Sequence, residues 1–293
     1  MKKRVGFVAI VGRPNVGKST LLNLMVGEKL APVSDKPQTT RGVVRGICTQ
    51  AEGQIIFIDT PGHHAPQDDL GRWMIGEIEK SLEAVDLLYW MVLPKRPGFA
   101  DQSILELLRS RKVPLFLVMN QVDRYPKPSL LPALDAYQQM HAFKELIPIS
   151  AKTGDQVPLL VKKTFEYLPE GELLYPEDQI SDQQERFFVQ ELIREKIFIQ
   201  TDQEVPYAAS VMIEEFKERN DKLVDIRATV LVEKQSQKAI MIGKNGDRMK
   251  QIGQEARLEI EKILGKKVFL QLWVKVLPGW KESPSDLKRL GYE

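Results

Sequence analysis

A glycine-rich segment close to the N-terminus constrains this chain more than any other feature. It reads Gly12-Arg13-Pro14-Asn15-Val16-Gly17-Lys18-Ser19 and lies between an apolar run and a segment of helical periodicity. This is the Walker A spacing, in which glycines let successive backbone N–H groups and a helix N-terminus face phosphates. We therefore predict that Lys18 reaches the β- and γ-phosphates of a nucleotide and that Ser19 binds Mg²⁺. The alternative is a glycine-rich turn that binds nothing.

Short apolar runs alternate with helix-like segments in the first part of the chain. The sequence predicts strands at 5–11, 55–58, 87–93, 115–119 and 146–149, and helices at 19–25, 70–84, 102–109, 130–141 and 156–167. A further strand-like run covers 43–49. This alternation indicates an α/β fold with a mostly parallel sheet between helices. Ligands gather at the carboxyl ends of the strands in such sheets.

Two short motifs at later strand ends indicate which base the site accepts. They are Asn120-Gln121-Val122-Asp123 and Ser150-Ala151-Lys152. Asp123 can accept from the ring N–H and the exocyclic amine of guanine, a donor pair that adenine lacks, and a site built in this way rejects the analogue. A backbone N–H of the second motif would bind the guanine carbonyl oxygen. The sequence therefore predicts a GTP and GDP site.

Two further segments are expected to sense the γ-phosphate. Asp59-Thr60-Pro61-Gly62 ends the strand at 55–58, so that Asp59 would hold Mg²⁺ through water and Gly62 would offer its N–H to the γ-phosphate. The segment Gln38-Thr39-Thr40-Arg41 is exposed by composition. A threonine there can bind Mg²⁺ only while the γ-phosphate is present, which would make the loop a switch. We expect this threonine to be Thr40 rather than Thr39.

The order of elements changes after an acidic, proline-punctuated segment at 168–178. A helix at about 184–199 leads to strands at about 207–215 and 224–233. A short helix, the loop Gly243-Lys244-Asn245-Gly246, a helix at about 248–264 and a strand at 267–276 follow. This is the order of a type II KH domain, which clamps a single-stranded nucleic-acid backbone over its G-x-x-G loop. A simple turn between helices is the alternative.

Basic residues cluster around this loop. The candidate RNA-binding residues are Lys238, Ile242, Gly243, Lys244, Asn245, Gly246, Arg248 and Lys250, with Lys234 nearby. Such a charge run is often only a solvated face. Ile240, Ile242 and Ile252 would be either walls of a groove or core residues, and we expect Trp273 and Trp280 to pack rather than stack on bases.

Composition sets the remaining bounds. The 293 residues carry a formal net charge of +2, so any nucleic-acid site must be a local patch. The lone cysteine, Cys48, excludes an intramolecular disulfide and a multi-cysteine metal site, and a buried thiol is expected. The first apolar run ends at Gly12, too early for a signal peptide or a membrane span. We expect a cytoplasmic protein.

These features together resemble the Era family of GTPases. The match covers Gly12–Thr20, Gln38–Arg41, Asp59–Gly62, Ser150–Lys152 and the second domain. The resemblance implies a G domain at 1–168, a linker at 169–183 and a KH domain with its tail at 184–293. It also implies hydrolysis of GTP with Mg²⁺, binding near the 3′ end of small-subunit (16S-type) ribosomal RNA and a role in assembly of that subunit. Weak peripheral membrane association and a monomeric state are further expectations.

The chain departs from the family pattern at two positions. Gln121 stands where the family normally has lysine, so we predict nucleotide binding weaker by roughly 1 kcal/mol. His63 stands where many small GTPases place the glutamine that orients water. It is either a neutral polar group beside the water or a solvent-facing residue. Together with the phosphate-contacting residues named above, the candidate catalytic residues are Lys18, Thr40, Gly62 and His63.

Two other functions stay open on the sequence alone. One is a nucleotide-regulated RNA-binding scaffold with negligible hydrolysis, and the other is a GTPase whose second domain binds a protein or a membrane surface. The intact G-x-x-G loop argues against the latter.

Overall fold

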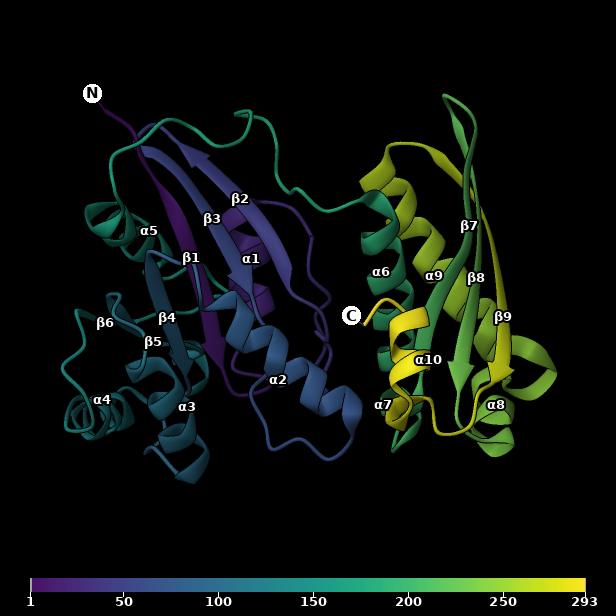
Figure 1. Ribbon diagram of the computed structural model, residues 1–293, viewed down its shortest axis with the longest axis horizontal. Coiled ribbons are helices and arrows are strands. Elements are labelled where there is room, and N and C mark those ends of the chain that lie inside the picture. The colour runs from purple at the N-terminus through teal and green to yellow at the C-terminus, as the bar shows by residue number, and fades with distance from the viewer. Residues whose placement is uncertain (1, 293) are drawn as a thin grey trace. The chain divides into compact units, whose positions relative to one another are not determined.

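The structure, a computed structural model, describes residues 2–292 and divides into two compact units (Figure 1). The first unit comprises the chain up to Ala65 together with Met74–Asp182. The second comprises Pro66–Trp73 together with the chain from Gln183 onward. Each unit has its own sheet and its own apolar core.

The first unit is built on a six-stranded sheet in the order β2-β3-β1-β4-β5-β6. Its strands are β1 (Arg4–Gly12), β2 (Val44–Gln50), β3 (Gly53–Asp59), β4 (Leu87–Val92), β5 (Leu115–Met119) and β6 (Glu145–Pro148). The strands from β3 to β6 in this order pair in parallel. The edge strand β2 runs antiparallel to β3. The predicted class, α/β with a mostly parallel sheet, is confirmed.

Helices lie on both faces of this sheet (Figure 1). They are α1 (Lys18–Val26), α2 (Asp69–Ser81), α3 (Phe99–Arg109), α4 (Leu130–Gln138) and α5 (Val157–Tyr167). Helices α2, α3 and α4 share an apolar core to which β1 contributes Ala9 and Val11. Alternate strand residues point to opposite faces. The equally buried Val8 and Ile10 therefore face the side where α1 and α5 contact β1.

The strand register brings the predicted motifs to one edge of the sheet. Ile10 pairs with Asp59, the last residue of β3, and the Gly12–Ser19 loop begins two residues further on. The ends of β5 and β6 pair with one another in the same parallel direction. The segments at 120–123 and 150–152 therefore start at this edge too.

The segment predicted as a linker is hydrogen-bonded to the first unit. The N–H of Ile47 in β2 donates to the carbonyl of Ile180 at 2.8 Å. Gln54 in β3 is fully buried, and its Oε1 accepts from the N–H groups of Leu174 and Tyr175, both at 3.0 Å. The segment is therefore tied to β2 and β3 along its length.

The second unit packs helices on a three-stranded sheet in the order β7-β8-β9. Strand β8 is antiparallel to β7 and parallel to β9. Helices α6 and α9 share the core with the sheet. The elements are α6 (Glu185–Gln200), α7 (Val205–Ala208), β7 (Ser210–Asn220), β8 (Leu223–Val232), α8 (Gln235–Ile242), α9 (Asp247–Leu264), β9 (Lys267–Val276) and α10 (Pro284–Arg289).

Short 3₁₀ turns occur in both units. They are Val122–Arg124 and Lys127–Ser129 in the first unit, and Lys244–Gly246 and Trp280–Glu282 in the second.

The strand predicted at about 207–215 is wrong at both ends. Val205–Ala208 forms α7, with a proline in its first turn. The strand continues to Asn220 because its charged second half pairs with β8 as an exposed hairpin. The short tail helix α10 was not predicted, since six residues show too little periodicity to be recognised.

Two expectations from composition can be compared with the structure. Cys48 is buried, as expected, and burial raises the pKa of its thiol. Within residues 2–292, no helix combines the length and the apolar character that a membrane span requires.

Candidate nucleotide site and nucleic-acid groove

Two glycines of the Gly12–Ser19 loop are required by close packing. A Cβ on Gly12 would lie 2.4 Å from the carbonyl oxygen of Met91 in β4. A Cβ on Gly17 would lie 2.3 Å from Nδ2 of Asn120, and Gly17 has a φ of +96°, which L side chains rarely adopt. The loop therefore passes too close to its neighbours for side chains at these positions. Its backbone leads directly into the N-terminus of α1, where N–H groups can face an anion.

Lys18 is the first residue of α1, and its side chain is buried. Its Nζ donates to the carbonyl oxygens of Gly12 and Arg13, both at 3.2 Å. Burial lowers the pKa of Lys18 to about 8, an effect that the carboxylate of Asp59 partly offsets. Phosphate oxygens would stabilise this buried ammonium and raise its pKa again.

The three residues predicted to bind Mg²⁺ lie together. The Ser19 hydroxyl donates to Asp59 Oδ2 at 2.6 Å, and its Oγ lies 2.8 Å from Thr40 Oγ1. Mg²⁺ prefers oxygen ligands and usually combines one or two carboxylates with waters and substrate phosphates. This cluster of one carboxylate and two hydroxyls is of that kind.

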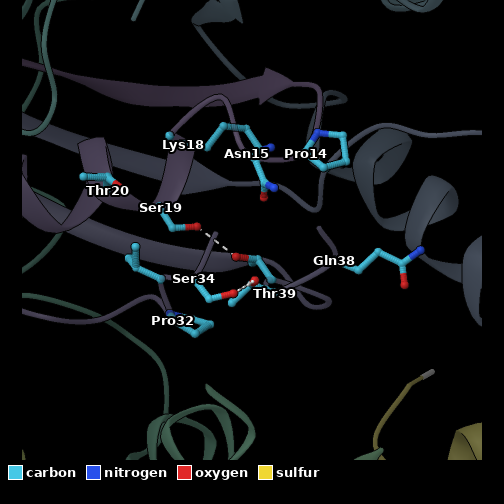
Figure 2. Close-up of a pocket in the computed structure, with 13 residues that line it drawn as sticks. Pro14, Asn15, Lys18, Ser19, Thr20, Pro32, Ser34, Gln38 and Thr39 are labelled. Atoms are coloured by element: carbon cyan, nitrogen blue, oxygen red, sulfur yellow. Dashed lines mark hydrogen bonds between the residues drawn. The ribbon is translucent and has the colours of Figure 1, made fainter. Parts of the chain in front are cut away.

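The neighbouring Thr39 has different partners. Its Oγ1 lies 2.7 Å from Ser34 Oγ (Figure 2). It also donates to the carbonyl oxygen of Lys36 at 2.6 Å. These hydrogen bonds join Thr39 to residues of its own loop, whereas the Thr40 hydroxyl lies beside Ser19. The pocket drawn in Figure 2 is lined by Pro14, Asn15, Gly17, Lys18, Ser19, Thr20, Pro32, Val33, Ser34, Gln38, Thr39, Thr40 and Gly62.

Asp59 is fully buried, and one of its oxygens lacks a partner. Within residues 2–292, no hydrogen bond reaches its Oδ1. Burial raises the pKa of Asp59 to about 6, although Lys18 and the Ser19 hydroxyl lower it. An unsatisfied buried carboxylate oxygen is costly, and a divalent cation or a water bound to it would satisfy this atom. The donor set therefore fits Mg²⁺.

The segment after β3 packs against the phosphate loop. A Cβ on Gly62 would lie 2.8 Å from Cα of Pro14. The N–H of His63 donates to the carbonyl oxygen of Gly12 at 3.1 Å. The Thr60 hydroxyl donates to a β1 carbonyl at 2.8 Å, so this side chain anchors the strand end rather than reaching into the pocket.

The side chain of His63 is half-buried rather than simply solvent-facing. Burial lowers its pKa, with smaller contributions from His64 and Lys18, which favours the neutral imidazole. In His64, Nδ1 lies 2.9 Å from the Gly62 carbonyl oxygen and Nε2 lies 3.0 Å from Nε2 of Gln38. That His63 orients the attacking water stays a prediction.

Asn120 ties three loops together. Its Nδ2 donates to the carbonyl oxygen of Val16 at 2.7 Å, and its Oδ1 accepts the N–H of Ala151 at 2.8 Å. Asp123 is exposed, and its Oδ1 accepts from the Ser150 hydroxyl at 2.7 Å. Because the amide of Asn120 is committed to the protein, recognition of guanine would depend on Asp123.

Gln121 reaches the phosphate loop although it is shorter than a lysine. Its Nε2 donates to the carbonyl oxygen of Asn15 at 3.0 Å. Compared with the family pattern, what is missing here is the positive charge rather than contact with the loop. Of its neighbours in the two guanine motifs, Val122 is half-buried and Lys152 is exposed.

The Gly243–Gly246 loop joins α8 to α9 in the second unit. Gly243 has a φ of +76°, and a Cβ there would lie 2.8 Å from Cβ of Arg248. Gly246 has a φ of +82° and open space around it. Lys244 and Asn245 are exposed at the tip, while the Arg248 guanidinium donates to a carbonyl of α8. The loop thus exposes backbone and one cation to solvent.

A groove of about 500 Å³ lies beside this loop, between α9 and β9. It is lined by Gly246, Met249, Lys250, Gly253, Gln254, Arg257, Val268, Phe269, Leu270 and Leu272. Of the predicted RNA-binding residues, Gly246 and Lys250 are in this lining. Lys238, Ile242, Gly243, Lys244, Asn245 and Arg248 are not. Ile252, considered as a wall, is a fully buried core residue.

Arg257 and the apolar side of the groove were not predicted from the sequence. Lys250, Gly253, Gln254 and Arg257 share one face of α9, because side chains three, four and seven residues apart align on a helix. That spacing, counted from Lys250, was the available signal. The apolar side comes from β9, and nothing local in the sequence links that strand to α9.

The two tryptophans of the second unit differ in exposure. Trp280 is fully buried and donates through Nε1 to the carbonyl oxygen of Ala208 at 3.0 Å, which confirms its packing role. Trp273 in β9 keeps 43% of its surface exposed, so packing does not account for it.

Comparisons with known proteins agree with this arrangement. Residues 7–121 match the family described as 50S ribosome-binding GTPases, and residues 204–281 match the KH domain family. The GTPase Era of Ruminiclostridium cellulolyticum is 46% identical over 294 residues, which cover 100% of this chain and 99% of the relative. The chain belongs to the Era family of GTPases. The GTPase Era of Geobacter sp. strain M21 is 48% identical over 297 residues, covering 100% of this chain and 99% of that one.

Solved structures of Era share the whole architecture. An Aquifex aeolicus Era variant bound to GDP and AlF4⁻ matches with a TM-score of 0.95 and 41% identity over 99% of both chains. An Era complex with MgGDPNP and nucleotides 1506–1542 of 16S ribosomal RNA matches with the same score, identity and coverage. The prediction of a P-loop GTPase unit followed by a KH domain, and of an enzyme that hydrolyses GTP, is confirmed.

Proposed function

We propose that this Era-family GTPase binds Mg²⁺ and GTP at the edge of the first sheet and that its second unit holds the 3′ end of small-subunit ribosomal RNA. The observation that carries the nucleotide site is the cluster of Ser19, Thr40 and Asp59 with the unsatisfied Oδ1. The residues assigned to the nucleotide are Gly12–Thr20, Asp59–His63, Asn120–Asp123 and Ser150–Lys152.

Each part of this site has a distinct role in the proposal. Ser19 and Thr40 would hold Mg²⁺ through their hydroxyls, and Asp59 would hold it through water. The metal would neutralise charge on the β- and γ-phosphates. Lys18 and the loop N–H groups stabilise the phosphate oxygens, and Asp123 selects guanine. Thr40 and Gly62 come from the two segments that respond to the γ-phosphate, and catalysis by such a site is positioning and charge stabilisation.

The two neighbouring threonines test this assignment against a matched control. Ser19→Ala and Thr40→Ala should each weaken Mg²⁺-dependent binding of a non-hydrolysable GTP analogue, measured by titration calorimetry with and without Mg²⁺. Thr39→Ala removes a hydroxyl that faces Ser34 and Lys36 and should leave the Mg²⁺ dependence unchanged. An equal loss in Thr39→Ala and Thr40→Ala would contradict the proposed metal site.

The RNA-binding part of the proposal is supported by the groove beside the G-x-x-G loop. The loop presents Lys244, and the groove adds Lys250 and Arg257 beside an apolar side from β9. Proteins that bind single-stranded RNA place cations along the path of the RNA backbone and apolar side chains against its bases. The groove and the loop together offer both. The relative solved with nucleotides 1506–1542 of 16S ribosomal RNA suggests the same RNA class here and a role in assembly of the small ribosomal subunit.

Binding of a fragment with that 1506–1542 sequence tests the RNA assignment. The double variant Lys244→Asp, Asn245→Asp should lose most of its affinity in a fluorescence anisotropy titration, while GTP binding stays normal. Equal affinity in the variant and the natural protein would instead favour a protein or membrane surface as the partner of the second unit.

The remaining expectations from the family resemblance belong to this proposal. In this proposal, residues 1–168 bind the nucleotide, residues 169–183 connect the two parts, and residues 184–293 bind RNA. A cytoplasmic monomer with weak peripheral membrane association is the expected state. A scaffold with negligible hydrolysis would bind RNA and GTP equally well but release no phosphate.

A further inference from the structure

The loop between β4 and α3 exposes an aromatic ring that packing does not explain. Phe99, the first residue of α3, keeps 85% of its surface exposed, more than any other large apolar side chain within residues 2–292. Burying a side chain of this size stabilises a protein by about 1.5–3 kcal/mol relative to leaving it in water. The ring therefore contributes little to the fold and is available to a partner.

Two cations precede this ring, and neither is neutralised. Lys95 and Arg96 are exposed, and within residues 2–292 neither forms an ion pair. The nearest carboxylate in sequence, Asp101, is buried and already used. Its Oδ2 lies 3.6 Å from Nη1 of Arg13 and accepts the N–H of Gly98 at 2.9 Å.

The loop is also held in a fixed shape. Pro94 is buried and Pro97 is half-buried, so that prolines bracket the two cations. Asp101 caps the start of α3 through the Gly98 N–H. The ammonium of Lys95 lies 5.9 Å from the centre of the Tyr125 ring. Charges on a rigid loop lose less conformational entropy when they bind than charges on a mobile one.

We infer that Lys95, Arg96 and Phe99 form a second RNA contact, on the GTPase unit itself. The two cations would bind phosphates of a single strand, and Phe99 would stack on a base. This inference rests on the RNA binding proposed above. A docked protein would need a larger apolar patch, whereas Phe99 is the one exposed apolar side chain between Leu93 and Ala100. Two cations without ion pairs beside a single exposed ring therefore favour RNA over a protein as the partner of this loop.

The test compares RNA affinity and its salt dependence in the full-length protein. The probes are the 1506–1542 fragment and complete 16S ribosomal RNA, titrated at several KCl concentrations. In Lys95→Ala, Arg96→Ala, the slope of log affinity against log salt for complete 16S RNA should fall by roughly 1.4, since each phosphate contact with a single strand adds about 0.7. Phe99→Ala should weaken binding by roughly fivefold or more.

A matched control removes two other exposed cations of the same unit. Lys112→Ala, Lys144→Ala should leave affinity and slope unchanged, since these residues lie away from this loop in the sequence. The groove variant Lys250→Ala, Arg257→Ala reports separately on the proposed RNA site of the second unit. Loss of RNA affinity in this groove variant would support the proposed RNA site of the second unit whether or not the variants of the β4–α3 loop lose affinity.

Two outcomes would overturn the inference. In the first, both loop variants bind both RNAs with unchanged affinity and slope. In the second, they bind both RNAs normally but no longer sediment with purified small ribosomal subunits, which would assign the loop to a ribosomal protein instead. Loss confined to complete 16S RNA supports the inference and places the contact outside nucleotides 1506–1542.

Discussion

The molecule contains two glycine loops at helix N-termini, and they differ in how closely they are packed. The loop before α1 is pressed against β4 and Asn120, so a Cβ on Gly12 or Gly17 would meet atoms within 2.4 Å. The loop before α9 is crowded only at its first glycine, where a Cβ on Gly243 would lie 2.8 Å from Cβ of Arg248, and it is open at Gly246, which would have nothing within 4 Å of a Cβ. In the first loop, glycine is needed for space as well as for backbone conformation. In the second loop, Gly246 is needed for backbone conformation alone.

This difference agrees with the ligand that we propose for each loop. A nucleotide site must place N–H groups around one small ligand, and the surrounding hydrogen bonds from Lys18 and Asn120 fix the loop before the ligand arrives. A loop that follows an RNA backbone needs access rather than enclosure. Most of its selectivity must then come from the neighbouring groove, here α9 and β9.

The largest expected effect is that of Gly17→Ala in the first loop, and Gly246→Ala is the matching substitution in the second loop. Gly17→Ala combines a left-handed φ, which costs about 1–2 kcal/mol, with a clash that costs about 1–3 kcal/mol more. It should lower the free energy of unfolding by about 2–5 kcal/mol and abolish GTP binding. Gly246→Ala should cost only the backbone part, about 1–2 kcal/mol. Chemical denaturation of both variants measures this, and equal losses would remove the distinction between the loops.

The second prediction concerns the buried charge beside the phosphate loop. The pKa of Asp59 is raised to about 6, so the ionised carboxylate destabilises the nucleotide-free fold. The penalty is absent below the unfolded pKa near 4 and grows until the pH passes 6. Asp59→Asn should therefore stabilise the nucleotide-free protein at pH 7, by about 3 kcal/mol, while abolishing Mg²⁺-dependent GTP binding.

Thermal unfolding from pH 4 to 8 measures this effect. The difference between Asp59→Asn and the natural protein should increase up to about pH 6 and then level off. A natural protein that is the more stable of the two at pH 7 would show that the carboxylate is better satisfied than its unpaired Oδ1 indicates.

A third, smaller effect is expected in the open loop's groove. Each of Lys250→Ala and Arg257→Ala should reduce the slope of log RNA affinity against log salt by roughly 0.7. Affinity for GTP should not change, because these residues belong to the second unit. Unchanged RNA binding in both variants would mean that the groove is not the path of the strand.

The smallest effect is expected at Gln121. The natural side chain already donates to Asn15, so Gln121→Lys changes charge rather than contact. We expect GTP and GDP to bind about fivefold more tightly, which corresponds to roughly 1 kcal/mol. Preference for guanine over adenine should persist because Asp123 is unchanged. A variant with unaltered affinity would show that the departure from lysine has no consequence.

Prediction from sequence was most successful where chemistry follows strand ends. Ser19 and Asp59 were placed together because parallel strands bring their carboxyl ends to one edge, and their hydrogen bond shows that placement. The direction of β2 was not stated, although the two-residue connection between Gln50 and Gly53 allows only an antiparallel pair.

Prediction was least successful where function depends on packing between distant segments. Arg257 lies on the face of α9 that carries Lys250, but only the approach of β9 turns that face into a groove. The exposure of Phe99 was equally inaccessible, because the residue lies outside the helix predicted at 102–109 and the sequence assigned it to no face of an element. Tertiary contacts decide such cases, and no local pattern records them.

Coupling between RNA binding and GTP hydrolysis is tested most directly by the rate of phosphate release with and without the 1506–1542 RNA fragment at fixed salt. We expect RNA to change this rate in the natural protein, and we expect Lys244→Asp, Asn245→Asp to abolish the change while keeping the basal rate. A rate indifferent to RNA, together with tight RNA binding, would contradict this coupling by showing that the two loops work independently.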